Sequence, residues 1–215
     1  MSELTFGGFN SLRAMDPSPC KPFDRKRAGM NLGEGAAVLI LEDLNGAVKK
    51  GAKIYAEFLG YGIGGEAYHI TAPEPTGIRE ARIMMEAIEE SGIKPPEVDH
   101  INAHGTGTPL NDKVETLSIK KAFGERAYSI PVSSIKSMVG HCLGSAGAIE
   151  AVTSILSILY QFIPPTINHQ GGDEDCDLDY VPGKSREKEV RVVLSNSFAF
   201  GGNCTTLVFG KYNYL

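Results

Sequence analysis

Residues 133–150 constrain this chain more than any other segment, and they read S-S-I-K-S-M-V-G-H-C-L-G-S-A-G-A-I-E. The segment places a cation (Lys136), an imidazole (His141) and a carboxylate (Glu150) among glycine, alanine and serine residues. Such small residues let the backbone approach other backbone or a ligand closely, because little side-chain mass intervenes. The apolar run that begins at Ser145 predicts a helix that is apolar on most faces and therefore buried. By itself, the segment fits a catalytic loop and a tight structural loop equally well, because structural networks also hold charged groups.

The overall composition is that of an ordinary globular protein. Of the 215 residues, 42% are hydrophobic and 22% are charged, which permits one large domain or two small ones with a sizeable core. The formal net charge of -5 argues against a nucleic-acid-binding surface, which would be basic. A basic run could receive an acidic carrier protein, although such a run is more often a solvated face. Its members are Lys21, Arg25, Lys26 and Arg27.

The cysteines and the N-terminal residues indicate a cytoplasmic protein. The four cysteines contain no C-x-x-C pair, which excludes the usual zinc patterns and a disulfide framework and favours free thiols in a reducing compartment. The first fifteen residues lack an apolar signal core, and no apolar run approaches the ~20 residues that a membrane span needs. We therefore expect no membrane anchor.

The pattern of apolar runs and turn residues predicts alternating strands and helices. We expect strands at 35–42, 54–62, 98–103, 129–134, 191–195 and 205–209, and helices at 44–51, 76–92, 112–123 and 145–160. The last two strands flank F-A-F-G-G-N, a tight turn between antiparallel neighbours. This order predicts an α/β fold with a mixed β-sheet between layers of helices. Residues 1–32 are rich in Pro, Gly and Arg and predict a loop with at most one short helix.

Two common motifs occur in incomplete form. Gly60, Gly62 and Gly65 match G-x-G-x-x-G, but prolines follow where a dinucleotide site needs a helix, so we reject that interpretation. A D-x-D-x-D pattern begins at Asp175, but Tyr180 stands where a calcium loop needs glycine. Neither motif indicates a ligand.

Three loops directly follow predicted strands and can converge on one site: His104 with its glycines, the 136–141 loop and the turn at 198–202. Ligands of such sheets bind at the carboxyl ends of the strands. Two neutral imidazoles that point N–H groups at one spot would form an oxyanion hole, and Lys136 with Glu150 would form a buried ion pair that orients the loop. Zinc is the rival use of two histidines, but no H-x-x-x-H pair or third soft ligand lies nearby.

Three motifs carry a resemblance to a known family. They are N-A-H-G-T-G-T-P-L-N-D, the segment 133–150 and S-N-S-F-A-F-G-G-N. They resemble the β-ketoacyl-acyl-carrier-protein synthases of type II fatty-acid synthesis, and the chain-elongating synthase II group fits best. The resemblance runs from about residue 6 to the end of the chain. It implies a thiolase-like fold and a decarboxylating Claisen condensation.

The resemblance also implies roles for the charged and imidazole residues. In that family, a cysteine accepts an acyl group from an acyl carrier protein. The two motif histidines, here His104 and His141, then bind the malonyl thioester carbonyl and stabilise the enolate that forms when carbon dioxide leaves. The motif lysine corresponds to Lys136, which is paired with Glu150 and supports the histidines electrostatically.

Further positions are assigned by the same resemblance. Thr106 and Thr108 match the threonines that bind the pantetheine arm of the carrier protein, and Phe200 matches a gating phenylalanine whose N–H helps to form the acyl oxyanion hole. The resemblance implies no organic cofactor, and it implies a dimer for the complete enzyme. Some members hold a buried monovalent cation with oxygen ligands. The matching positions are Asn102, Glu150, Ser195 and Asn196.

The nucleophile motif of the family, of the type T-A-C-S-S, is absent from this sequence. Cys142 stands beside the motif histidine, where the family has an ordinary residue, and Cys20 and Cys204 lack the small-residue flanks. We therefore interpret residues 33–215 as a C-terminal thiolase-like domain and residues 1–32 as a loop-rich continuation of a missing N-terminal half. That half, or a second subunit, would carry the nucleophile.

Two other functions are considered. The chain could be a non-catalytic partner subunit that resembles the chain-length factors of aromatic polyketide synthases, although intact His104, Lys136 and His141 argue against a scaffold. It could also be a thiolase-like degradative acyltransferase, which would lack the second histidine of the G-H-x-L-G-S-A-G loop. Neither the acyl chain length nor the choice between fatty-acid and polyketide synthesis follows from the sequence.

Overall fold

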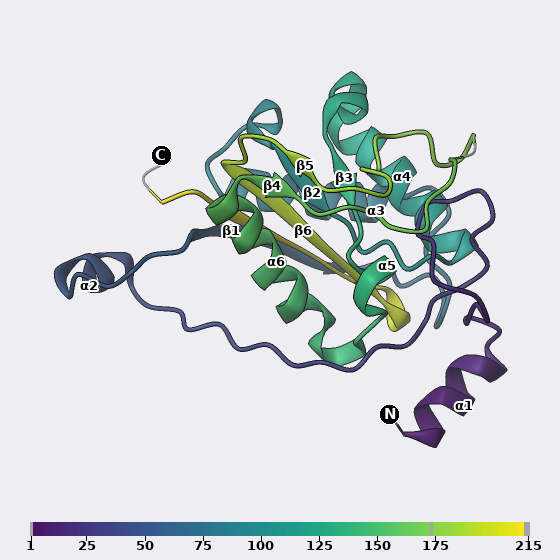
Figure 1. Cartoon of the computed structure of the whole chain (residues 1–215). Coiled ribbons are helices and arrows are strands. Elements are labelled where there is room, and N and C mark those ends of the chain that lie inside the picture. The colour runs from purple at the N-terminus through teal and green to yellow at the C-terminus, as the bar shows by residue number, and fades with distance from the viewer. Residues whose placement is uncertain (1, 173, 213–215) are drawn as a thin grey trace.

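A computed structural model describes residues 2–172 and 174–212, and a five-stranded mixed sheet organises it (Figure 1). The strands lie in the order β1 (Glu57–Gly65), β7 (Asn203–Gly210), β6 (Val192–Ala199), β2 (His100–Asn102) and β3 (Val132–Ser133). The strand β7 is antiparallel to both of its neighbours, β1 and β6, whereas β2 is parallel to both β6 and β3. A two-stranded sheet joins β4 (Phe162–Ile163) to β5 (Arg186–Glu187). The predicted mixed sheet and its antiparallel closing hairpin are therefore confirmed.

Helices cover both faces of the sheet (Figure 1). One face is covered by α6 (Ala146–Tyr160), and the other by α3 (Ile78–Glu90) and α4 (Pro109–Phe123). The alternation of side chains along β6 separates two cores, because Leu194 packs with α3 and α4 whereas Val193 packs with α6. The expected layers of helices are confirmed.

Shorter helices connect these elements. They are α1 (Glu3–Ser11), α2 (Leu44–Lys49), α5 (Lys136–Val139) and the 3-10 turns η1 (Pro95–Glu97), η2 (Gly124–Ser129), η3 (Leu143–Ser145) and η4 (Phe200–Gly202). The short helix expected within residues 1–32 is α1, which stands away from the body of the molecule and has no buried residue (Figure 1).

The glycines of the G-x-G-x-x-G pattern lie inside β1 and serve packing. A Cβ atom at Gly62 would come within 2.2 Å of the carbonyl oxygen of Ile83 on α3, and one at Gly60 would come within 2.6 Å of Ser91 Oγ. Side chains at these positions would push α3 away from the sheet. The glycines therefore let a helix lie close to a strand, which agrees with the rejection of a dinucleotide site.

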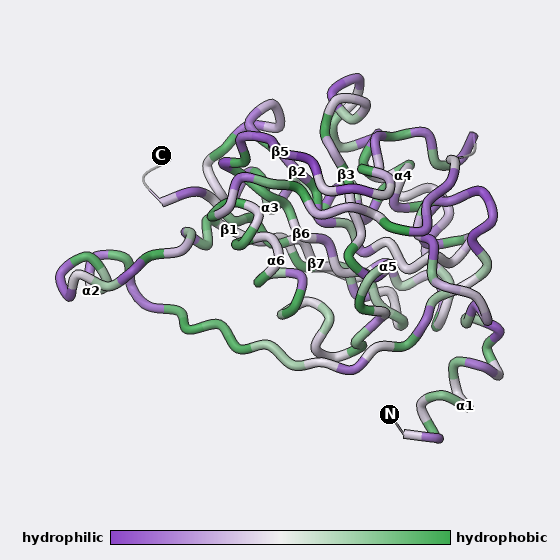
Figure 2. The backbone as a smooth tube through the Cα atoms, in the orientation of Figure 1, coloured by the Kyte–Doolittle hydropathy of each residue, from purple (hydrophilic) through white to green (hydrophobic). Residues whose placement is uncertain are grey.

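The predicted strand at 35–42 is wrong. This segment is extended but forms no ladder with any strand of the described chain, and Val38, Ile40 and Leu41 are 87%, 88% and 74% exposed. Figure 2 shows it as an apolar run that passes along the outside of the molecule to α2. Its apolar composition favours a buried strand, but a strand also needs a neighbour to satisfy its backbone hydrogen bonds.

The helix α6 is less buried than its composition predicts. Its inner face is buried, but Leu156 and Tyr160 are 36% and 67% exposed. By length and composition, Leu143–Tyr160 could cross a membrane, with 33% of this window buried inside the structure. Because α6 lies across the sheet and carries a buried ion pair, we interpret it as a sheet-covering helix and not as a membrane span.

Candidate functional site

Two imidazoles from separate loops meet at one place, as the sequence predicts. His104 lies just beyond the end of β2, and His141 lies just beyond α5. Their ring centroids are 5.3 Å apart, and the rings are nearly perpendicular at 81°. Phe198, near the end of β6, packs its ring 6.0 Å from that of His104. The carboxyl ends of two parallel strands and the last turn of the sheet therefore converge on this pair.

Hydrogen bonds assign the same tautomer to both rings. The ammonium of Lys136 lies 3.4 Å from His104 Nδ1, and because an ammonium can only donate, Nδ1 is the acceptor. The backbone N–H of Leu143 donates to His141 Nδ1 over 3.1 Å. In a neutral ring whose Nδ1 accepts, the proton is on Nε2. Each ring therefore presents an Nε2–H donor on the side away from its support.

Both rings are neutral at physiological pH. Burial holds the pKa of His104 well below its usual range, and the neighbouring Lys136 and His141 add to this effect. Burial, followed by the charge of Lys136, lowers the pKa of His141 to about 3. A neutral imidazole can donate a hydrogen bond to a developing negative charge without losing a proton to solvent.

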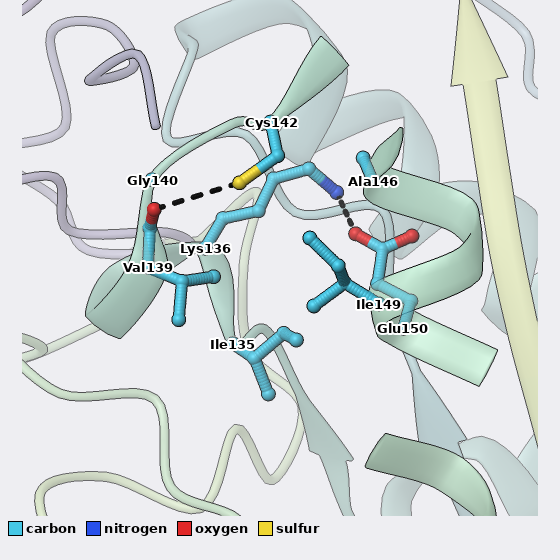
Figure 3. A pocket seen from close by; sticks show the side chains of 8 residues that line it. All are labelled: Ile135, Lys136, Val139, Gly140, Cys142, Ala146, Ile149 and Glu150. Carbon is cyan, nitrogen blue, oxygen red and sulfur yellow. Dashed lines mark hydrogen bonds and ion pairs between the residues drawn. The ribbon is translucent and has the colours of Figure 1, made fainter. Parts of the chain in front are cut away.

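A buried ion pair supports the two rings. The Lys136 ammonium on α5 contacts the Glu150 carboxylate on α6, and both side chains are only 2% exposed (Figure 3). Lys136 Nζ also donates to the backbone oxygen of His104 over 2.6 Å. Burial raises the pKa of Glu150, whereas the Lys136 charge and its hydrogen bond act in the opposite direction. The predicted pairing of Lys136 with Glu150 is thus what the structure shows, and it places a positive charge beside His104.

Sequence reasoning missed two acidic side chains that hold the His104 loop. The carboxylate of Glu115 on α4 accepts the backbone N–H groups of His104 and Gly105, each over 2.8 Å. Asp112, one helical turn earlier, accepts the N–H of Gly107 over 3.2 Å. Burial raises the pKa of Glu115 to about 7, although the two backbone donors oppose this rise. The sequence does indicate this role, because Asp112 and Glu115 lie three residues apart, and therefore on one face, of the helix that follows the glycine-rich turn.

The residues expected to bind the pantetheine arm lie beside the imidazoles. The hydroxyls of Thr106 and Thr108 are 2.8 Å apart, and Thr106 is buried while Thr108 is partly exposed. Phe200, the expected gate, is 45% exposed on η4, and its ring stacks on Phe9 of α1 with centroids 5.9 Å apart. Gly201, the next residue, has φ 79°, which favours glycine at this turn.

The side chains of the four residues expected to bind a monovalent cation lie on two faces of the sheet. Asn102 and Ser195 pair across β2 and β6, and the amide of Asn102 donates to the Glu150 backbone oxygen over 2.9 Å. Asn196 lies on the opposite face of the sheet, where its amide contacts Glu115 over 3.3 Å. Successive residues of a strand point to opposite faces, so the Asn196 side chain lies away from those of Asn102 and Ser195, and the cation site stays a prediction. Asn102 Oδ1 is buried without a hydrogen-bond partner and remains a suitable oxygen ligand.

All four cysteines are buried, and none forms a disulfide in the described chain, as expected from their spacing. Burial raises the pKa of Cys20 to about 12 and also raises the pKa of Cys142 and Cys204. Among these three, no thiol is activated as a thiolate nucleophile. This agrees with the prediction that the nucleophile belongs to another part of the enzyme.

Comparison with protein families places the sequence of this chain in a known family. The model described as "Beta-ketoacyl synthase, C-terminal domain" matches residues 55–170, and that of the N-terminal domain of the same family matches residues 1–47. The chain belongs to the β-ketoacyl synthase family. This β-ketoacyl synthase chain is 51% identical to the 3-oxoacyl-[acyl-carrier-protein] synthase 2 of Synechocystis sp. and 48% identical to that of Coxiella burnetii. The two matches cover 99% and 97% of this chain but 52% of each relative.

Solved structures give the same result. A type II polyketide ketosynthase in complex with its acyl-carrier protein matches 99% of this chain and 54% of its own, with a TM-score of 0.97 and 38% identity. A β-ketoacyl synthase from Burkholderia phymatum matches 99% of this chain and 53% of its own, with a TM-score of 0.93 and 38% identity. The thiolase-like fold is therefore confirmed, and the chain spans about half the length of these relatives, as expected for a C-terminal half.

Proposed function

We propose that this chain supplies the decarboxylation half-site of a β-ketoacyl-acyl-carrier-protein synthase. The observation that carries the proposal is the pair of neutral imidazoles, His104 and His141, each supported at Nδ1 and each presenting an Nε2–H. The buried Lys136–Glu150 pair beside them is consistent with this role, because it adds a positive charge near a developing anion.

The reaction follows from the two donors. The carbonyl oxygen of a malonyl thioester accepts hydrogen bonds from Nε2–H of His104 and of His141. When carbon dioxide leaves, the electron pair of the broken C–C bond moves onto the thioester, and the resulting enolate oxygen is held by the same two donors. The enolate carbon then attacks the acyl thioester on the nucleophilic cysteine, and the cysteine thiolate leaves. Each such donor is worth roughly 10²–10³ in rate, as measured in other oxyanion holes.

The remaining functional assignments follow from position. Thr106 and Thr108 would bind the pantetheine arm of an acyl carrier protein, which is supported by their position on the loop that follows His104, and Phe200 on η4 would act as the gate. The partners would be malonyl- and acyl-carrier protein, together with the N-terminal half or second subunit that carries the nucleophile. The complete enzyme would act as a dimer in the cytoplasm, in fatty-acid or polyketide synthesis.

The monovalent cation is retained only as a secondary proposal. Asn102, Glu150 and Ser195 offer oxygen atoms on the α6 face of the sheet, and the unpartnered Asn102 Oδ1 supports a ligand there. No step of the reaction above depends on this ion. Asn102→Leu in the reassembled enzyme would remove any dependence of stability on potassium concentration, whereas an unchanged dependence would contradict the site.

The experiment is reassembly. This chain is mixed with an N-terminal half that carries a T-A-C-S-S-type motif, and carbon dioxide release from malonyl-carrier protein is measured together with the condensed product. We expect both activities from the mixture and no condensation from either half alone. Condensation by the 215-residue chain alone would contradict the proposal, as would full decarboxylation by a mixture that contains His104→Ala.

The same assay tests the two rival functions. A chain-length-factor-like partner would leave carbon dioxide release unaffected by His104→Ala, because its own histidines would take no part in the chemistry. A thiolase-like degradative enzyme would prefer coenzyme A thioesters to carrier-protein thioesters. We expect loss of decarboxylation in the variant and preference for the carrier protein.

A further inference from the structure

Three side chains outside the histidine site form a compact cluster. Glu66 follows β1, Glu80 lies in the first turn of α3, and Cys204 lies on β7. One ligand atom from each of the three lies within 4.8 Å of the other two. Glu80 and Cys204 are each only 1% exposed, whereas Glu66 is partly exposed and lies at the open side of the cluster.

The carboxylate of Glu80 is the unusual member of this cluster. Both of its oxygens are buried and have no hydrogen-bond partner in the structure. A buried carboxyl group without a partner is costly, because it has lost its hydration and gained nothing in return. A carboxyl oxygen of Glu66 lies within 4.8 Å of a Glu80 oxygen, so the two acids face each other. A cation between the two carboxylates would offset their mutual repulsion and would give the Glu80 oxygens a partner.

The distances suit a single tetrahedral ion. Cys204 Sγ lies 3.7 Å from Glu66 Oε1. Two ligands of one zinc ion, with bonds of about 2.3 Å to sulfur and about 2.0 Å to oxygen, are separated by roughly 3.5 Å. The ligand atom of Glu80 lies within 4.8 Å of the other two, so the three groups can reach that separation by adjustment of their side chains.

We propose that Glu66, Glu80 and Cys204 bind a thiophilic divalent cation of the zinc type. A thiolate with two carboxylates favours zinc or cadmium over magnesium and calcium, which prefer oxygen ligands alone. Three protein ligands leave the fourth position for water. Binding displaces a proton from the thiol and from each carboxyl that is protonated, because the ligands coordinate in their deprotonated forms.

Such an ion would brace the turn η4 beside the histidine site. The N–H of Glu66 already donates to the Gly202 backbone oxygen over 2.9 Å, and Cys204 lies two residues beyond that glycine. Phe198, which packs against His104, also packs with Cys204 and with Ile83 of α3. The ion would therefore connect β1, α3 and β7 at the turn that carries Phe200. The inference does not depend on the proposed function, because its test measures metal binding.

The test titrates the full chain with zinc by calorimetry and with cadmium by the ultraviolet charge-transfer band of a cadmium–thiolate bond. We expect one equivalent of metal bound and the band to appear. Cys204→Ser should abolish the band, and Glu80→Gln should weaken binding at least tenfold. Two matched controls should bind as the unaltered chain does: Glu90→Gln, an exposed acid at the far end of α3, and Cys142→Ser, another buried thiol.

Circular dichroism establishes that each variant is folded. If Cys204→Ser does not fold, metal binding by Glu80→Gln tests the proposal instead, because glutamine has nearly the same shape as the acid it replaces. The proposal is overturned if the unaltered chain gives no cadmium–thiolate band, or if binding is unchanged in Glu80→Gln. Either result would mean that the three groups only share protons among themselves.

Discussion

The buried pair of Lys136 and Glu150 provides the sharpest test of how this half-site is built. Both side chains are 2% exposed, so neither charge is relieved by solvent when its partner is removed. Glu150→Leu leaves the Lys136 ammonium with two uncharged acceptors, the His104 backbone oxygen at 2.6 Å and His104 Nδ1 at 3.4 Å. Removing one partner of a buried ion pair costs about 3–5 kcal/mol, and we expect a loss of that size in the free energy of unfolding.

A surface pair in the same chain gives the matched control. Arg82 and Glu86 form an i,i+4 ion pair on α3 with side chains 65% and 39% exposed. Pairs of this kind contribute only about 0.3–0.5 kcal/mol, because water and salt screen them. Glu86→Leu should therefore change stability far less than Glu150→Leu, although both changes replace one glutamate by leucine on a helix.

Replacing both buried partners separates the loss of charge balance from the loss of packing. In Lys136→Met with Glu150→Leu, no charge remains buried, and replacement of a buried pair by apolar residues is often neutral or stabilising. We expect the double variant to recover most of the stability lost by Glu150→Leu. In the reassembled enzyme it should still lack decarboxylation, because the positive charge beside His104 is gone.

The assay is urea denaturation of the full chain, followed by circular dichroism, with the midpoints compared at an unchanged m-value. The reasoning is refuted if Glu150→Leu costs no more than Glu86→Leu. It is also refuted if the double variant is as unstable as the sum of its two single variants, because the two charges would then not interact.

Three further predictions rest on other contacts. Side-chain ¹⁵N NMR should show His104 and His141 as neutral Nε2–H tautomers at pH 5, and a charged ring at that pH would contradict the tautomer assignment. Burial holds both folded pKa values below that of the unfolded chain, so the rings favour the folded state above about pH 6.5. This contribution to stability is lost as pH falls toward the folded pKa. Burial raises the pKa of Glu115 to about 7, above its ordinary value of 4.5, so its contribution to stability is fully present below the unfolded pKa and is lost as pH rises through the folded pKa. Glu115→Gln should flatten the pH dependence of unfolding between those values by up to about 3 kcal/mol, and an unchanged slope would exclude the shift. Gly62→Ala should lower the melting temperature by several degrees, because the new Cβ would meet an α3 carbonyl oxygen at 2.2 Å. Gly144→Ala should have a much smaller effect, because no atom lies within 4 Å of the Cβ added there. Equal shifts in melting temperature would contradict the packing argument.

Some parts of the fold follow directly from local sequence. The helix α4 begins at a Thr-Pro step and ends at Gly124, and the closing hairpin turns at the glycines after Phe200. These signals act over a few residues, so the sequence contains them completely. The position of His104 is also local, because it directly follows β2 and is followed by glycine.

Other parts depend on groups that are distant in sequence. The apolar segment at 35–42 has the composition of a buried strand, but it is exposed because no strand of the described chain pairs with it. Alternation along β6 places Asn196 opposite Ser195, but only the register of β6 against β2 places Asn102 beside Ser195. A local pattern specifies what a segment can do and not which neighbour it meets.

The sequence by itself determined the chemical groups of this β-ketoacyl synthase half: two histidines, a lysine and a glutamate, each in a setting of small residues. Only the tertiary structure decided their protonation. The tautomers of His104 and His141 depend on contacts from Lys136 and from the Leu143 backbone, and the support of the His104 loop depends on Glu115. The physical reason is that the pKa and the tautomer of a group depend on burial and on hydrogen-bond partners, which the fold brings from other elements.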